Sequence, residues 1–366
     1  MTELEANNLL DKITYSMENI PFISYAAVIE NPTMKGRFLI EYGIVLNNTE
    51  NFIYGAYQQC NIVDWAESPN TPKELLNYAK NSTLDFSQRN ISLDEPFMKK
   101  IPFVEDLITE KTKYFSHITS GVEALNCNHR LSFEQHDLLK SGYSIGSRTT
   151  HYKGGTIGAF FQLIDDNSIY AITNQHVIGD RSSSQSKNEK VCHPAVGHTL
   201  DYEDEQARDI GWVKKLIINE DMDVGIVEIS TEEVENIKSG HPEASDKYTR
   251  IISPEVGDIV FKYGINTKET NGKIISKNAS CRVWYDHNGS RESLIMKNQI
   301  MVENMKADCG DSGSIVYNSN MEVLGLLFAR DRRAKRAFFT SITKIFSNDN
   351  GNNINDQPPY NFKKFI

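Results

Sequence analysis

The sequence has few cysteines and no long hydrophobic run. Its five cysteines are scattered over 366 residues, and no two follow a C-x-x-C spacing. A disulfide framework or a structural zinc site needs paired cysteines, so we expect neither. Apolar runs stay well short of the ~20 residues that cross a bilayer, and the first residues are acidic where a signal peptide is basic and then apolar. We therefore expect a cytoplasmic protein that does not enter a membrane.

Positive charge is also scarce. The chain carries 39 lysines and arginines against 49 aspartates and glutamates, a net charge of −10. General nucleic-acid binding requires a basic surface, so nucleic acid is not an expected partner. Hydrophobic residues make up 39% and charged residues 24% of the chain, which is typical of a globular protein with a large core. The length allows two or three domains.

The first part of the chain mixes helical and strand-like patterns. Residues 3–19 place apolar side chains on one helical face. Two strand-like runs follow at residues 22–30 and 37–46, separated by a proline and a glycine. Residues 71–140 are more polar and helical in pattern. We therefore predict a small α+β domain over residues 1–140.

From Gly154 onwards the pattern changes to short β-type runs broken by turns. Nine or ten such runs over roughly 190 residues favour an all-β fold, either a pair of barrels or a sandwich. We place this domain at residues 141–346. The remainder, residues 347–366, is rich in asparagine and contains two prolines, which predicts a loosely docked tail.

The stretch ADCGDSGSIVY, residues 307–317, places Gly-Asp-Ser-Gly directly before an apolar strand. These are common turn residues, so an ordinary turn is one interpretation. The other is chemical: Ser312 would present a nucleophilic hydroxyl on a tight turn, with backbone N–H groups beside it to hold an oxyanion. The pattern alone does not choose between them, because a serine nucleophile also needs a base and an acid.

His176 has the most suggestive setting among the nine histidines. In SIYAITNQHVIGD it follows the end of an apolar strand, where an imidazole can face a cleft. A solvated loop histidine is the alternative interpretation. The nearest rivals are His151, His193 and His198.

The best candidate for the acid is Asp223, in EDMDVGIVEIS. An aspartate at the start of an apolar strand can be partly buried and can hold an imidazole in one tautomer. Asp209 has the same Asp-apolar-Gly sequence and is a rival, and Asp221 is a weaker one. An aspartate that merely ends a polar loop remains the alternative.

The order His176, Asp223, Ser312 resembles that of the chymotrypsin-like (trypsin-fold) serine proteases. The motifs AITNQHV, DMDVGIV and CGDSGS carry this resemblance. GGTIGAFF, HPAVG and VFKYGINTKETNGKI further resemble the intracellular branch related to the plant NARROW LEAF protein and its bacterial relatives. The likeness extends over about residues 141–346. It implies a mainly β protein, a trypsin-like double β-barrel, preceded here by the α+β domain.

This resemblance implies a serine endopeptidase that needs no metal or organic cofactor. Ser312 would be the nucleophile, His176 the general base and Asp223 the residue that orients it, while the N–H groups of Gly310 and Ser312 would form the oxyanion hole. Asp311 would fix the turn through its side chain. The expected partners are a polypeptide substrate and a regulatory protein or signal that acts through the N-terminal domain. The alternative is a catalytically silent trypsin-like fold that serves as a peptide-binding or regulatory scaffold.

The same resemblance places Lys306 and Arg330 at the base and wall of the pocket for the residue before the cleaved bond. If either cation faces the pocket, an acidic or small residue would be favoured there over a basic one. The alternative is that both are ordinary solvated charges.

Overall fold

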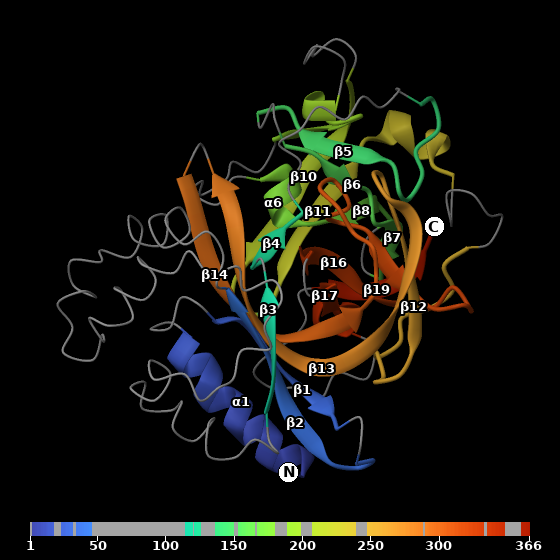
Figure 1. Ribbon diagram of the computed structural model, residues 1–366. Coiled ribbons are helices and arrows are strands. Elements are labelled where there is room, and N and C mark those ends of the chain that lie inside the picture. Colours follow the sequence, from blue (N-terminus) through green and yellow to red (C-terminus); the bar gives the residue numbers. More distant parts are fainter. Residues whose placement is uncertain are drawn as a thin grey trace.

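The computed structural model is a mainly β structure with few helices, built on two curled sheets (Figure 1). Short helices and 3-10 turns connect some of the strands. The structure describes residues 2–17, 23–31, 34–45, 114–119, 121–125, 136–149, 153–164, 167–179, 189–198, 207–238, 247–287, 290–332, 335–347 and 360–366.

The first sheet has nine strands and forms a barrel with its own apolar core. Core side chains such as Phe160, Val191 and Val227 come from three different strands of the sheet and are almost fully buried. In sheet order the strands are β18 (Phe346–Ser347), β19 (Tyr360–Phe365), β7 (Ala159–Leu163), β8 (Ile169–Thr173), β11 (Asp223–Ile229), β10 (Arg208–Ile218), β9 (Lys190–His193), β5 (Ser144–Ser147) and β6 (Gly155–Thr156).

The second sheet has ten strands and forms the other barrel. Its strands β16 (Val323–Asp331) and β17 (Arg336–Ser341) are buried along their whole length. The apolar run VLGLLFA of β16 favours this burial. The path runs β12 (Ile259–Gly264), β15 (Ile315–Tyr317), β16, β17, β14 (Ser290–Glu303), β13 (Lys268–His287), β1 (Ile23–Glu30), β2 (Phe38–Val45) and β3 (Tyr114–Thr119), and β4 (Val122–Ala124) pairs with β13 and β16 off this path.

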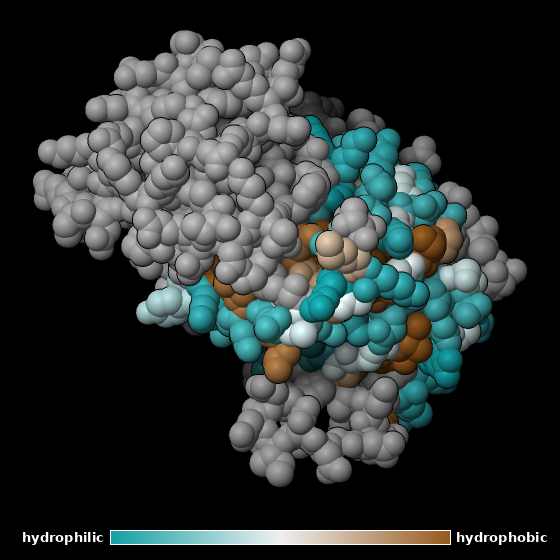
Figure 2. All heavy atoms as spheres, turned by 60° about the horizontal axis from the view of Figure 1, so that its bottom comes forward, coloured by the Kyte–Doolittle hydropathy of each residue, from teal (hydrophilic) through white to brown (hydrophobic). Residues whose placement is uncertain are grey.

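The N-terminal strands are built onto the second sheet. Strand β1 pairs antiparallel with β13, with Tyr25 opposite Cys281. Helix α1 (Glu3–Met17) packs against the same strands at the bottom of Figure 1, where Thr14 Oγ1 donates to Ser280 Oγ at 2.7 Å. Apolar α1 residues such as Leu10 face inwards and are buried. The molecular face around this end is mainly hydrophilic where it is described (Figure 2).

A buried ion pair also joins the N-terminal strands to the barrel. Glu41 of β2 accepts hydrogen bonds from Arg336 of β17, with Nε to Oε1 at 2.8 Å, and from the Tyr25 hydroxyl at 3.0 Å. Both ends of the ion pair are largely shielded from water. Burying a carboxylate without a partner costs free energy, so the Glu41–Arg336 pair favours a single register between the N-terminal strands and the barrel.

Two expectations from the sequence are wrong. Residues 114–119 and 122–124 are strands rather than part of a helical region, and residues 136–140 are not helical either. The expected helical pattern over residues 71–113 lies outside the described residues. The end of the expected loose tail is strand β19, which pairs with β7 and places Phe365 against a buried cluster. The Phe365 side chain supplies apolar contacts that the asparagine-rich composition obscured.

Four further helical elements lie among the described residues: α6 (Gln175–Ile178), α7 (Ile342–Ile345) and the 3-10 segments η3 (Val196–His198) and η6 (Thr231–Asn236). No helix in the described part of the chain is both long and apolar enough to cross a membrane.

Candidate active site

Ser312 lies on a tight turn between the two sheets. Gly310 and Gly313 have φ values of +92° and +90°, a region that favours glycine. A side chain at Gly313 would also meet Thr173 Oγ1 at 2.2 Å. The first barrel holds the turn through Thr156, whose N–H donates to Ser312 O at 2.8 Å and whose hydroxyl donates to Gly310 O at 2.7 Å. The two glycines and these bonds fix the direction of the Ser312 side chain.

The structure brings His176 and Asp223 to this serine. His176 lies on the short helix α6 directly after β8, and its Nε2 is 2.7 Å from Ser312 Oγ. Its Nδ1 is 2.5 Å from Oδ2 of Asp223, which is fully buried at the start of β11. The backbone N–H of His176 donates to the other carboxylate oxygen at 3.3 Å. With Nδ1–H donating to the carboxylate, the Nε2 lone pair is free to accept the Ser312 proton.

The rival aspartates have other partners. Asp209 pairs with Arg148 at 2.6 Å and with Lys190 at 2.8 Å on the far strands of the first sheet. Asp221 lies 3.9 Å from Lys344. Asp223 is therefore the aspartate that contacts the His176 imidazole.

The rival histidines are structural. His193 and His198 are buried, and burial lowers the pKa of each to about 4. His193 Nδ1 donates to the Ser144 carbonyl at 2.8 Å, and His198 Nδ1 lies 2.7 Å from the Ser144 hydroxyl. Both imidazoles therefore stay neutral at pH 7 and help to hold the first barrel together. His151 lies outside the described residues.

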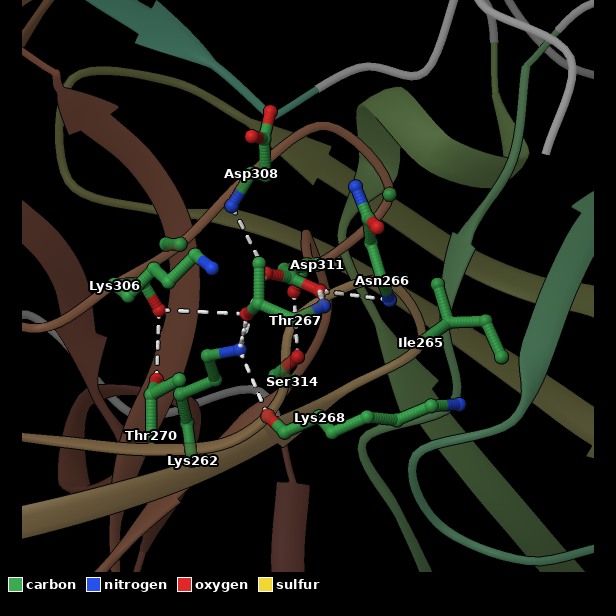
Figure 3. A network of polar contacts seen from close by, with 12 residues as sticks. Lys262, Ile265, Asn266, Thr267, Lys268, Thr270, Lys306, Asp308, Asp311 and Ser314 are labelled. Atoms are coloured by element: carbon green, nitrogen blue, oxygen red, sulfur yellow. Dashed lines mark hydrogen bonds and ion pairs between the residues drawn. The ribbon is translucent and has the colours of Figure 1, made fainter.

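Asp311 is held by a network of buried and half-buried polar groups behind the turn (Figure 3). Its Oδ1 accepts the N–H groups of Asn266 and Thr267 at 3.0 and 3.1 Å. Its Oδ2 accepts the Thr267 hydroxyl at 2.5 Å, the Asp308 N–H at 2.9 Å and the Lys262 ammonium at 3.1 Å. The Asp311 carboxylate thus ties the turn to β12 and to the start of β13.

Lys262 is the counter-charge of Asp311, and the sequence did not single it out. Both side chains are completely buried. Burial lowers the pKa of Lys262, and the attraction of the Asp311 carboxylate acts in the opposite direction. A lysine inside the apolar run IVFKYG is unusual, and this is the signal that could have identified it.

The two candidate pocket cations differ in their surroundings. The Lys306 side chain is exposed, and the Lys306 carbonyl accepts the Thr270 hydroxyl at 2.7 Å. Arg330 is buried and pairs with Asp308 at 2.8 Å and with Glu123 at 3.1 Å. The Arg330 charge is therefore balanced by acids of the chain itself.

The two predicted oxyanion donors lie in the turn. Gly310 N–H donates to a carbonyl oxygen of the chain, that of Leu125, at 2.8 Å. Among the described residues, no group of three histidines, cysteines or acids is placed to hold a metal ion.

A family model described as Trypsin matches residues 152–348, more than half of the chain. The chain belongs to the trypsin-like serine protease family. The match covers His176, Asp223 and Ser312 together with most strands of both sheets, but not β1 to β5 or β19. A search of curated proteins found no match.

Solved structures of trypsin-family proteases show distant similarity to the chain. A glutamic acid-specific serine protease that uses a histidine triad in substrate binding is 16% identical, with a TM-score of 0.39, over 56% of this chain and 95% of that one. Thermobifida fusca protease A is 17% identical, with a TM-score of 0.40, over 56% and 92%. Cellulomonas bogoriensis chymotrypsin is 13% identical, with a TM-score of 0.36, over 57% and 94%.

Proposed function

We propose that this member of the trypsin-like family is a serine endopeptidase with a Ser312–His176–Asp223 triad. The observation that carries the proposal is the continuous series of contacts from Ser312 Oγ to His176 Nε2 at 2.7 Å and from His176 Nδ1 to Asp223 at 2.5 Å. Within the family, motifs such as VFKYGINTKETNGKI favour the branch related to the plant NARROW LEAF protein.

The proposed reaction passes through an acyl-enzyme. Ser312 Oγ attacks a peptide carbonyl carbon while His176 Nε2 accepts its proton, and Asp223 stabilises the resulting imidazolium. The N–H groups of Gly310 and Ser312 hold the oxyanion. His176 then protonates the departing amine, and a water molecule hydrolyses the ester by the same proton route in reverse. The substrate is a polypeptide.

Labelling with a fluorophosphonate probe tests this proposal. Ser312 should become covalently labelled in the purified protein, and Ser312→Ala should remove both labelling and peptidase activity. His176→Ala should lower the rate by several orders of magnitude, because triad members act as a unit. The matched control is Ser319→Ala, since Ser319 is an exposed serine a short distance beyond the turn. A wild-type protein that neither takes the label nor cleaves any peptide, or an active Ser312→Ala protein, would contradict the assignment.

A further inference from the structure

Residues 122–125 of the chain lie along the strand that follows the nucleophile turn. Strand β4 pairs antiparallel with β16, with Ala124 opposite Ala329 and Glu123 opposite Arg330. Leu125 continues this pairing, because its N–H donates to the Phe328 carbonyl at 3.2 Å. Ser312 Oγ lies 3.3 Å from the same Phe328 carbonyl oxygen. The segment therefore runs as an added strand past the proposed nucleophile.

The carbonyl group of Leu125 points to the proposed oxyanion hole. Its oxygen accepts the N–H of Gly310 at 2.8 Å. This N–H belongs to the glycine whose positive φ sets the turn. The Leu125 N–H thus bonds to Phe328 and the Leu125 C=O to Gly310, both beside Ser312. The residue of a substrate that precedes the scissile bond would occupy the same position.

The Leu125 side chain lies in an apolar environment. It is fully buried and belongs to one hydrophobic cluster with Met305 and Ala307, which immediately precede the turn, and with Ala337 and Phe339 of β17. A charged side chain at this position would be buried without a counter-charge, at a large desolvation cost. The surroundings thus fit leucine in the position before the scissile bond.

Glu123 supplies a second point of contact, two residues before Leu125. Its Oε1 accepts Nε of Arg330 at 3.2 Å and Nη2 of Arg330 at 3.1 Å. The segment is also anchored at its start, where the Val122 N–H donates to Ser24 Oγ at 3.0 Å. Charge-assisted bonds from a buried arginine select an acid at this position.

We propose that residues 122–125, Val-Glu-Ala-Leu, are the sequence that this protease recognises, and that its own Leu125–Asn126 bond is a substrate. This rests on the proposed function. Ser312 Oγ bonds to the Leu125 carbonyl carbon and gives its proton to His176 Nε2. The bond to the Asn126 nitrogen breaks, and that nitrogen receives the proton. Water then hydrolyses the ester and restores Ser312, which leaves a Leu125 carboxylate and an Asn126 amino terminus.

Intact-mass analysis of the purified full-length chain tests the cleavage. The wild-type chain should break after Leu125, and Ser312→Ala should stay whole. The fraction cut at a given time should not depend on protein concentration, because the bond is already seated in the same molecule. Leu125→Lys should stop the break, whereas Leu138→Lys should not, since Leu138 is an exposed leucine of the same region. Ser312 that reacts with fluorophosphonate in a chain that is never cut after Leu125 would overturn the inference and leave the proposed function intact.

Short peptides test the recognition without altering the fold. The wild-type protein should cleave Val-Glu-Ala-Leu linked to a fluorogenic amine with a kcat/KM at least about tenfold above the same peptide ending in Lys or Glu. Replacing the peptide glutamate by lysine should lower kcat/KM, and Arg330→Gln should remove that difference through KM more than through kcat. A preference for Lys or Glu in the final position would overturn the proposed specificity. A protein that neither reacts with the probe nor cleaves any peptide would overturn the proposed function and this inference together.

Discussion

Asp223 and Asp209 both precede an apolar residue and a glycine, but they lie in different surroundings. Asp223 is buried against His176, whereas Asp209 is half exposed between two cations. Asp223→Asn should lower kcat on the order of 10⁴-fold, because the amide favours the wrong imidazole tautomer. Asp209→Asn is the matched control and should change kcat little. Steady-state kinetics measure kcat for both variants. A larger loss of kcat in Asp209→Asn than in Asp223→Asn would refute the assignment of Asp223 as the acid.

Lys262 offers a second test at the scale of single residues. Lys262→Met keeps most of the side-chain volume but leaves the buried Asp311 carboxylate without its ammonium partner. The free energy of unfolding should fall by about 3–5 kcal/mol, and activity should fall because Asp311 anchors the turn. Adding Asp311→Asn removes the unpaired charge and should recover part of the stability. Urea unfolding measures both changes. A double variant that is less stable than Lys262→Met alone would argue against the ion pair as the cause.

At the scale of elements, β9 and η3 should make the first barrel sensitive to acid. His193 and His198 have pKa values of about 4 in the folded protein against about 6.5 in an unfolded chain. The unfolded chain therefore binds more protons between these values. The contribution of these neutral histidines to the free energy of unfolding is complete above pH 6.5. It is lost as the pH falls towards 4, and the free energy of unfolding then decreases by up to about 3 kcal/mol for each histidine.

Urea unfolding at several pH values between 7.5 and 4 measures this effect. The wild-type free energy of unfolding should decrease steadily across that range. A His198→Gln variant, which cannot titrate there, should show a shallower decrease below pH 6.5. Equal slopes for the two proteins would show that His198 does not titrate as its burial implies.

A sequence predicts the functional residues that have a local pattern, but not the pairs that form between distant parts of the chain. His176, Asp223 and Ser312 each stand at a strand end beside turn residues, so a local pattern identifies them. Lys262 lies in β12 and Asp311 in the nucleophile turn, and the sequence around one gives no indication of the other. Glu41 and Arg336 are 295 residues apart and their pairing has no local signal either.

The assignment of residues 114–119 failed for a different reason. The sequence YFSHIT is rich in aromatic and β-branched residues, which favour a strand. However, residues 71–140 taken as a whole have a polar and helical pattern, and the prediction followed that longer stretch. The position of Leu125 could not be predicted either, because nothing in the local sequence VEALN indicates that this leucine lies beside the nucleophile turn. Its position depends on β16, which is far along the chain.

At the scale of the whole molecule, the N-terminal strands cover the edge of the second sheet. A chain that begins at Ser141 would lose β1 and would expose the edge of β13 around Cys281. It would also leave Arg336 without Glu41. We expect this shortened chain to be less soluble and less stable than the full chain, because an open strand edge promotes association. Size-exclusion chromatography and thermal unfolding measure the difference, and a shortened chain that matches the full chain in both would show that residues 1–140 form an independent module.

Strand β13 has a mechanical consequence for the whole molecule. It starts at Lys268, whose carbonyl accepts the Lys262 ammonium beside Asp311. Farther along, Cys281 pairs with Tyr25 of β1, and the ring centroid of Tyr285 lies 5.5 Å from that of His176. At about 3.3 Å per residue, the path along the curved strand from Lys268 to the pairing with β1 is roughly 40 Å long. A pulling force on the N-terminal strands would therefore load the same strand that supports both the nucleophile turn and the base, and tension at one end of the chain would reach the site directly.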